Sequence, residues 1–141
     1  MNRDVFRNIS YGLYIVSAKR DGRINGQISN TVIQITSEPA AIAVCINKKN
    51  LTHEFIQQSK SFAVSILDKD TPLKFVGSFG FNTGRNFDKF KNVKYKSGVT
   101  GAPIILEHTI GYVESEVTKS VDAGTHTLFI GRVIDADVKK I

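Results

Sequence analysis

The chain has 141 residues, of which 41% are hydrophobic and 23% are charged; this fits one domain with a real core and excludes an intrinsically disordered protein. A net charge of +6 favours anionic partners, and a single cysteine excludes a fold built on internal disulfides. Because no apolar run reaches the ~20 residues of a membrane helix and the first residues lack a secretory signal, we expect a cytoplasmic protein with no membrane contact.

The first predicted elements are two strands joined by a tight turn. Residues 12–19, GLYIVSAK, form the first strand, and Asp21-Gly22 is a hairpin turn signal. Residues 26–36 form the second strand, whose half with Val32 reads as buried, and Pro39 ends it because proline removes a ladder donor.

A helix between two further strands comes next. Residues 40–47 are almost continuously apolar, which predicts a strand buried on both faces, with Cys45 as a small buried hydrophobe. Asn50 is a plausible N-cap for the helix that follows, and residues 61–67 alternate as a strand does. The apolar residues at helical spacing are Leu51, Phe55 and Ile56.

The second half of the chain contains one more helix and two long strands. Thr71-Pro72 predicts a helix start, with the threonine hydroxyl as cap and proline at the first helical position. A glycine-containing irregular region follows over 80–103. Strands over 109–121 and 126–138 are joined by a connection short enough to make them an antiparallel pair.

Strands outnumber helices, and most connections are too short for the crossover helices that parallel sheets need. The order of elements therefore predicts a mainly β fold, a closed or nearly closed antiparallel barrel of six or seven strands with a few short helices at its rim. We expect residues 1–141 to form a single domain.

The common catalytic and metal signatures are absent from the sequence. One cysteine and three widely separated histidines argue against a metal site, and no phosphate-binding glycine loop or nucleophile elbow occurs. The densest basic segment, residues 85–96, has five Lys or Arg against one Asp and three interleaved aromatic residues. We interpret it as a solvated loop that could meet an anionic small molecule or an acidic protein, rather than nucleic acid.

Neutral hydrogen-bonding groups remain as the candidate site. GQISNT, residues 26–31, places polar side chains in a strand, and NKKNLTHEF, residues 47–55, leads a strand into a helix N-terminus where anions bind readily. The alternative for the second stretch is that Asn50 caps the helix and the lysines face water. Phe79 and Phe81, set among glycines, could stack on a planar ligand or plug one end of the barrel.

Several blocks, in this order, resemble the flavin reductase-like family of FMN-binding split barrels. The blocks are GLYIVSAK, GQISNTVIQITSEPAAIAVCINKKNLTHEFI, SFAVSILDKDTPLKFVGSFG, DKF, GAPII and DAGTHTLFIGRV. The chain is especially similar to flavoredoxins and to the flavin reductase-like domain of high-molecular-weight rubredoxins. The resemblance implies a six-stranded antiparallel split β-barrel, a homodimer, and one FMN per subunit at or near the dimer interface. Family members usually continue past the last strand, so it also implies a domain that is short at its C-terminal end.

The resemblance implies which residues hold FMN. The segment from Gln27 to Thr31 would run along the flavin ring, and the segment from Asn47 to Thr52 would hold the ribityl chain and phosphate. Phe79 or Phe81 would cover the ring. The cofactor-binding residues implied in this way are Gln27, Ile28, Ser29, Asn30, Thr31, Asn47, Lys48, Asn50, Leu51, Thr52, Phe79 and Phe81.

His126 is the candidate catalytic residue, since in some members the matching histidine lies near the nicotinamide of NAD(P)H. The family's Gly-Asp-His becomes Gly124-Thr125-His126 here. Hydride transfer to a flavin requires no paired carboxylates, which agrees with a site built from neutral groups.

The resemblance implies an FMN-dependent oxidoreductase that takes electrons from NAD(P)H. The acceptor would be free flavin, ferric iron, or an electron-transfer protein such as rubredoxin or a flavodiiron protein. One alternative is a pure electron-transfer module with a protein donor, which Thr125 and the basic segment 85–96 favour. The other is a non-redox barrel that binds some different phosphorylated ligand, or none.

Overall fold

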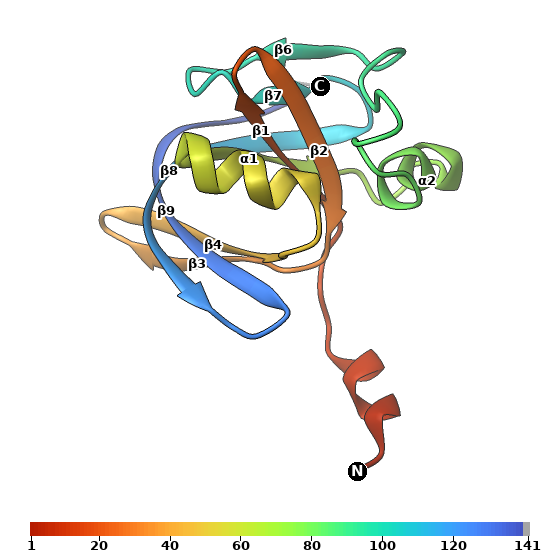
Figure 1. Cartoon of the computed structure of the whole chain (residues 1–141), viewed down its shortest axis with the longest axis vertical. Helices are drawn as coiled ribbons and strands as arrows, with labels where there is room; N and C mark the ends of the chain where they lie inside the picture. Colours follow the sequence, from red (N-terminus) through yellow and green to blue (C-terminus); the bar gives the residue numbers. More distant parts are fainter. Residues whose placement is uncertain (140–141) are drawn as a thin grey trace.

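A computed structural model describes residues 1–139 of the chain, and its largest unit is one antiparallel sheet (Figure 1). A short 3-10 helix, η1, lies away from the sheet at the N-terminus and buries none of its residues. The elements in chain order are η1 (Arg3–Asn8), β1 (Tyr14–Arg20), β2 (Arg23–Ser29), β3 (Val32–Ser37), β4 (Ala40–Asn47), α1 (Leu51–Ser59), β5 (Ser61–Leu67), α2 (Leu73–Gly80), β6 (Tyr95–Ser97), β7 (Pro103–Ile105), β8 (Thr109–Asp122) and β9 (His126–Val138).

The main sheet curls into a barrel that is split along one side. Its strand order is β2-β1-β5-β8-β9-β4-β3, so β2 and β3 occupy its two edges. Only Asn30 and Thr31 separate these two strands in the chain, so the edges must approach one another. The backbone N–H of Cys45 in β4 donates to the carbonyl of Thr31 at 3.3 Å. The predicted mainly β split barrel is confirmed.

The predicted single strand over 26–36 is wrong, because its two halves pair with different partners. β2 pairs with β1, whereas β3 pairs with β4, and the chain leaves the ladder at Asn30 and Thr31. The sheet therefore has seven strands, within the six or seven predicted from the order of elements and one more than the resemblance implies. The half predicted to be buried is an exposed edge, with Ile33 56% and Ile35 43% exposed.

The two helices begin where the sequence predicts, but with different end contacts. Asn50 makes no capping bond to α1, and Pro72 rather than Thr71 occupies the N-cap position of α2. The Thr71 hydroxyl instead donates to the carbonyl of Asp68 at 2.6 Å. The capping prediction for Thr71 is therefore wrong. Asn50 occupies the predicted N-cap position of α1, but its side chain bonds Gln27 instead of the helix.

The rest of the chain follows the predicted order. β4 and β5 have the predicted bounds, and β8 and β9 form the predicted antiparallel pair. The region predicted as irregular contains a small second sheet, in which β6 pairs with β7. A buried carboxylate anchors the turn between these strands, because Glu114 of β8 accepts hydrogen bonds from the backbone N–H groups of Val99 and Thr100, each at 3.1 Å.

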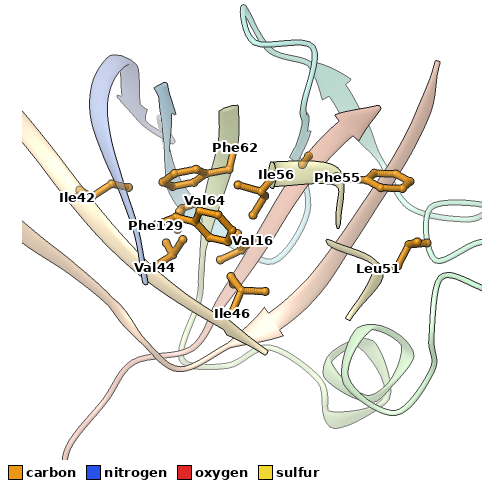
Figure 2. Close-up of a cluster of buried hydrophobic side chains, with 11 residues drawn as sticks. Val16, Ile42, Val44, Ile46, Leu51, Phe55, Ile56, Phe62, Val64 and Phe129 are labelled. Atoms are coloured by element: carbon orange, nitrogen blue, oxygen red, sulfur yellow. The ribbon is translucent and has the colours of Figure 1, made fainter. Parts of the chain in front are cut away.

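One apolar core lies between α1 and the inside of the barrel, and Figure 2 shows its side chains, with Leu51 and Phe55 set to one side of the others. It explains why α1 packs on the sheet: Leu51, Phe55 and Ile56 form the buried face that helical spacing predicts. The core residues labelled in Figure 2 are Val16, Ile42, Val44, Ile46, Leu51, Phe55, Ile56, Phe62, Val64 and Phe129. A second cluster around Phe79 and Phe90 fills the barrel end beside α2. The two clusters fix both helices, and hence the space between them.

Candidate functional site

A polar cleft of about 200 Å³ opens between β2, the start of α1 and the end of α2. Each wall comes from a different element, and the packing of α1 and α2 against the barrel sets its width. The lining residues are Asn25, Gln27, Ile28, Asn50, Leu51, Thr52, Phe79, Gly80, Phe81, Asn82, Thr83, Gly84 and Lys89. Amides and hydroxyls predominate among the polar side chains of this lining, so the cleft can donate and accept hydrogen bonds at several points.

Two side-chain hydrogen bonds join β2 to the start of α1 along one wall. The Asn25 amide Nδ2 donates to the Thr52 hydroxyl Oγ1 at 2.8 Å, and both residues are buried. The Asn50 amide Nδ2 donates to the Gln27 carbonyl Oε1 at 3.0 Å. These contacts hold the polar groups in place without exhausting their capacity, because an amide group has two N–H donors and an acceptor with two lone pairs.

The N-terminus of α1 faces the same cleft through Asn50, Leu51 and Thr52. The Asn50 side chain makes no capping bond, and its carbonyl accepts only the N–H of His53, at 3.1 Å, so the N–H groups of Leu51 and Thr52 are not satisfied from that position. Such N–H groups and the positive end of the helix dipole favour an anion. The sequence left open whether Asn50 caps the helix or the end is available to a ligand; in the structure Asn50 occupies the N-cap position without a side-chain bond to the helix.

Lys89 is a buried cation in this lining, and its chemistry differs from that of the amides. It is 6% exposed, and its Nζ donates to the carbonyls of Gly26 and Phe79, each at 2.9 Å. Burial lowers the pKa of Lys89 to about 8. The ammonium group therefore joins β2 to the end of α2, and it brings a positive charge to the cleft at neutral pH.

The two phenylalanines proposed to cover a ring have different environments. Phe79 is 1% exposed and packs edge-on against Phe90, with ring centroids 5.3 Å apart. Phe81 is 91% exposed and stands at the edge of the cleft. Phe79 thus belongs to the core below the cleft, whereas Phe81 is available to contact a ligand.

The structure brings seven of the twelve cofactor-binding candidates to the cleft. These are Gln27, Ile28, Asn50, Leu51, Thr52, Phe79 and Phe81. The link between β2 and β3 does not line the cleft. Ser29 is buried, and its hydroxyl accepts a hydrogen bond from the Thr31 N–H at 3.3 Å. Asn30 and Thr31 are exposed.

The remaining candidates gather on the far side of the start of α1, where β4 ends beside the β8–β9 turn. Asn47 lies opposite His126 in the ladder, and the Nδ1 of His126 is 2.8 Å from the Thr125 hydroxyl. The Lys48 ammonium pairs with Asp122 at 2.6 Å, and this hydrogen bond holds the pKa of the Asp122 carboxyl below its usual range. None of Asn47, Lys48 and His126 lines the cleft.

A buried histidine joins this second group to α1. The His53 Nε2 is 2.7 Å from the Thr127 hydroxyl, and its ring lies against Phe129 with centroids 5.2 Å apart. Burial lowers the pKa of His53, with a further contribution from the nearby charge of Lys48. The contact fixes the start of β9 relative to the helix whose N-terminus faces the cleft.

The cofactor-binding candidates named from the sequence do not include Asn25 and Lys89, which both line the cleft. Asn25 falls one residue before the polar stretch at 26–31, and it alternates with Gln27 on the cleft wall. Lys89 lies within the basic segment 85–96, where a lysine between Phe87 and Phe90 was the available signal.

None of the helices that the structure describes is long and apolar enough to cross a membrane.

A split antiparallel barrel with an amide-lined cleft, a free helix N-terminus and a buried lysine has the features of a small flavoprotein. The chain belongs to the flavin reductase like domain family, which matches residues 6–141. This membership confirms the predicted resemblance and the predicted class, a flavin-dependent oxidoreductase.

Similar proteins support the same assignment. The ferric-chelate reductase (NAD(P)H) of Archaeoglobus fulgidus is 49% identical over 140 residues, 99% of this chain and 83% of that protein. The high molecular weight rubredoxin of Moorella thermoacetica is 50% identical over 138 residues, 98% of this chain but only 60% of its own length. An FMN-binding protein from Thermus thermophilus has a TM-score of 0.81 at 26% identity, covering 89% of this chain and 70% of that one.

Proposed function

We propose that the cleft binds FMN, and the observation that carries this proposal is the convergence of three groups on it. Side-chain amides suit the alternating donors and acceptors of a flavin ring, while the α1 N-terminus and Lys89 suit an anionic phosphate. Gln27 faces the ring, and the phosphate end is held by Asn50 and Thr52, with Asn25 donating to the Thr52 hydroxyl. FMN supplies the redox chemistry, and the protein supplies binding, orientation and exclusion of water.

We propose that FMN takes electrons from NAD(P)H and passes them to an acceptor outside the chain. The name of the Archaeoglobus relative supports NAD(P)H as donor and ferric iron as acceptor. The rubredoxin name of the Moorella relative supports an electron-transfer protein as acceptor. The proposal also includes free flavin and a flavodiiron protein as possible electron acceptors.

An anaerobic spectrum tests the proposed cofactor and donor together. The purified protein, reconstituted with FMN, should absorb near ~450 nm, a property of the flavin itself. We expect NADH or NADPH to bleach this band in the absence of oxygen, and a ferric chelate to restore it. A protein that takes up no flavin would contradict the proposed cofactor, and would instead favour a non-redox barrel.

A flavin band that bleaches with dithionite but not with NADH or NADPH would favour the second candidate function, electron transfer from a protein donor. Thr125 in place of the family aspartate, and the position of His126 outside the cleft, favour this candidate. His126 near the reacting face therefore remains a prediction. So do the cofactor roles of Ser29, Asn30, Thr31, Asn47 and Lys48.

We also propose that two chains form a homodimer through the edge strand β3. An exposed, apolar sheet edge is a template for pairing with another chain, and Ile33 and Ile35 are both exposed on β3, with Ile35 at a β-bulge in its pairing with β4. A partner there would lie beside Asn30 and Thr31, next to the cleft. A cleft of about 200 Å³ is smaller than the roughly 300–1,000 Å³ of small-molecule sites, so a partner would enlarge the enclosed site.

Charging the proposed edge should separate the dimer. We expect the double variant Ile33→Lys, Ile35→Lys to elute as a monomer, because two lysines on each copy would meet across the interface without compensating charge. Sedimentation velocity gives the mass directly. Ile110→Lys is the matched control, since Ile110 is 52% exposed on β8, and it should leave the mass unchanged. A dimeric double variant would assign the interface to another surface.

A further inference from the structure

The N-terminal segment, residues 1–12, is a part of the chain that neither the core nor the cleft uses. All of its residues are exposed, and Figure 1 shows it extending away from the sheet. Among residues 1–139 its hydrogen bonds are internal: the Asp4 N–H donates to the Asn2 Oδ1 at 3.0 Å, and the Ile9 N–H donates to the Phe6 carbonyl at 3.3 Å. We refer to residues 1–12 as the arm.

The arm has no means of stabilising its own structure. Its helix, η1, has six residues, whereas isolated helices shorter than roughly 12–15 residues are marginal in water and 3-10 runs beyond about four residues are uncommon. Apolar side chains gathered on one exposed segment mark a contact surface. Those of the arm that are more than half exposed are Val5, Phe6, Ile9 and Tyr11. The arm therefore needs a surface outside the barrel from which it extends.

The edge strand β3 offers a matching surface. Its exposed side chains include Ile33 and Ile35, and Glu38 is exposed in the turn that follows it. The arm carries two arginines, Arg3 and Arg7, within η1. Within residues 1–139 neither arginine nor Glu38 forms an ion pair. Both surfaces thus present uncovered apolar groups, and their free charges have opposite sign.

The arm does not cover β3 of its own chain, since both are exposed. Its base nevertheless lies near the start of that strand, because Tyr14 pairs with Ser29 and β3 begins at Val32. A 3-10 helix of six residues is about 12 Å long, and four extended residues add roughly 13 Å. The arm is therefore long enough to follow β3, a strand of roughly 20 Å, on a second chain.

From these observations we propose that the arm of each chain docks on β3 of a second copy of this chain. The inference deepens the proposed homodimer and rests on it. Twofold symmetry lets each chain give and receive the same contact. Phe6 and Ile9 then pack on the exposed isoleucines of β3, and the arginines of η1 lie toward Glu38, which fixes the direction of the arm. A stable interface has about 20–30 residues on each side; β3 supplies six, and the arm adds twelve.

A double variant of the arm, Phe6→Glu with Ile9→Glu, tests the contact. We expect the dissociation constant of the dimer, measured by sedimentation velocity over a concentration series, to rise about tenfold or more, because a carboxylate is costly to bury on an apolar surface. Both side chains are exposed, so circular dichroism and thermal unfolding should match the wild-type protein. Leu73→Glu with Val99→Glu is the matched control: it changes the charge equally at two exposed apolar residues outside the arm and β3, and should leave the dissociation constant unchanged.

Photocrosslinking identifies the surface that receives the arm. With p-benzoylphenylalanine in place of Phe6, we expect illumination to join two chains, with the link at residues 32–37 of the second one. An unchanged dissociation constant in the arm variant, or a link to any other surface, overturns the inference. A dimer that survives in the arm variant but is lost in Ile33→Lys, Ile35→Lys overturns the arm contact alone and keeps the proposed interface. A monomeric wild-type protein contradicts the proposed homodimer, and the arm contact with it.

Discussion

Thr52→Val is expected to raise the dissociation constant of FMN on the order of tenfold or more. The hydroxyl of Thr52 is fully buried in the first turn of α1, beside the free N–H groups that we propose for the phosphate. A hydrogen bond to a charged group contributes roughly 1.5–3 kcal/mol, and 1.4 kcal/mol is about tenfold in affinity. Valine preserves the shape of the side chain, so the helix and the core beneath it should stay in place.

The same substitution also removes the acceptor of the Asn25 amide, which lies 2.8 Å from the hydroxyl. A buried donor left unpaired is unfavourable by roughly 1–3 kcal/mol, so thermal unfolding should be measured beside flavin fluorescence titration. Thr118→Val, on an exposed part of β8, is the matched control and should change neither quantity by much. An unchanged FMN dissociation constant in Thr52→Val would remove the phosphate from this end of the cleft.

The strands that sequence reasoning placed correctly are those whose pattern alone determines their burial. β4 is apolar except for Asn47 and is mostly buried, and β5 is mostly buried as well. Residues 26–36 carry an equally good pattern, but the pattern says nothing of which strand each half pairs with. β2 and β3 separate because β1 and β4 lie at opposite sides of the sheet order. That break follows from long-range pairing, which one sequence does not display.

In the candidate site, too, features that depend on nearby residues were predicted, whereas features that depend on residues far along the chain were not. The polar stretches at 26–31 and 47–55 were predicted from composition, and both contribute to the cleft. The roles of single residues depend on partners far along the chain. Asn50 fits the sequence rule for a cap, yet its amide binds Gln27, 23 residues earlier. Lys48 fits the rule for a phosphate ligand, yet it pairs with Asp122, 74 residues later.

Lys89 is the clearest case of a residue whose environment overrides its type. A lysine in a basic surface segment is expected to face water, because long charged side chains are almost never fully buried. Here the chain folds back so that its ammonium group reaches carbonyls of β2 and α2, 63 and 10 residues away. The carbonyl of Gly26 belongs to an edge strand, so Lys89 covers backbone that the sheet leaves unpaired at that point.

The burial of Lys89 predicts a specific dependence of stability on pH. Its pKa is about 8 in the folded protein and 10.5 for the unperturbed group, so between these values the unfolded chain holds a proton that the folded chain has released. Stability therefore rises as pH increases from 8 to 10.5, by on the order of 3 kcal/mol as an upper bound for this group. Below pH 8 both states carry the proton, and the cost of burying the charge is fully present.

Replacing the lysine by methionine should remove this rise, because the variant keeps the aliphatic chain and has no group to titrate. Chemical denaturation of the flavin-free wild-type and Lys89→Met proteins, from pH 7 to 10.5, measures the difference in unfolding free energy. Other groups that titrate in this range are common to both proteins and cancel. Lys91→Met, an exposed neighbour, should follow the wild-type curve. If the wild-type and Lys89→Met curves stay parallel across this range, the Lys89 ammonium is not buried as the structure places it, and the cleft loses the cation that we assign to its anionic end.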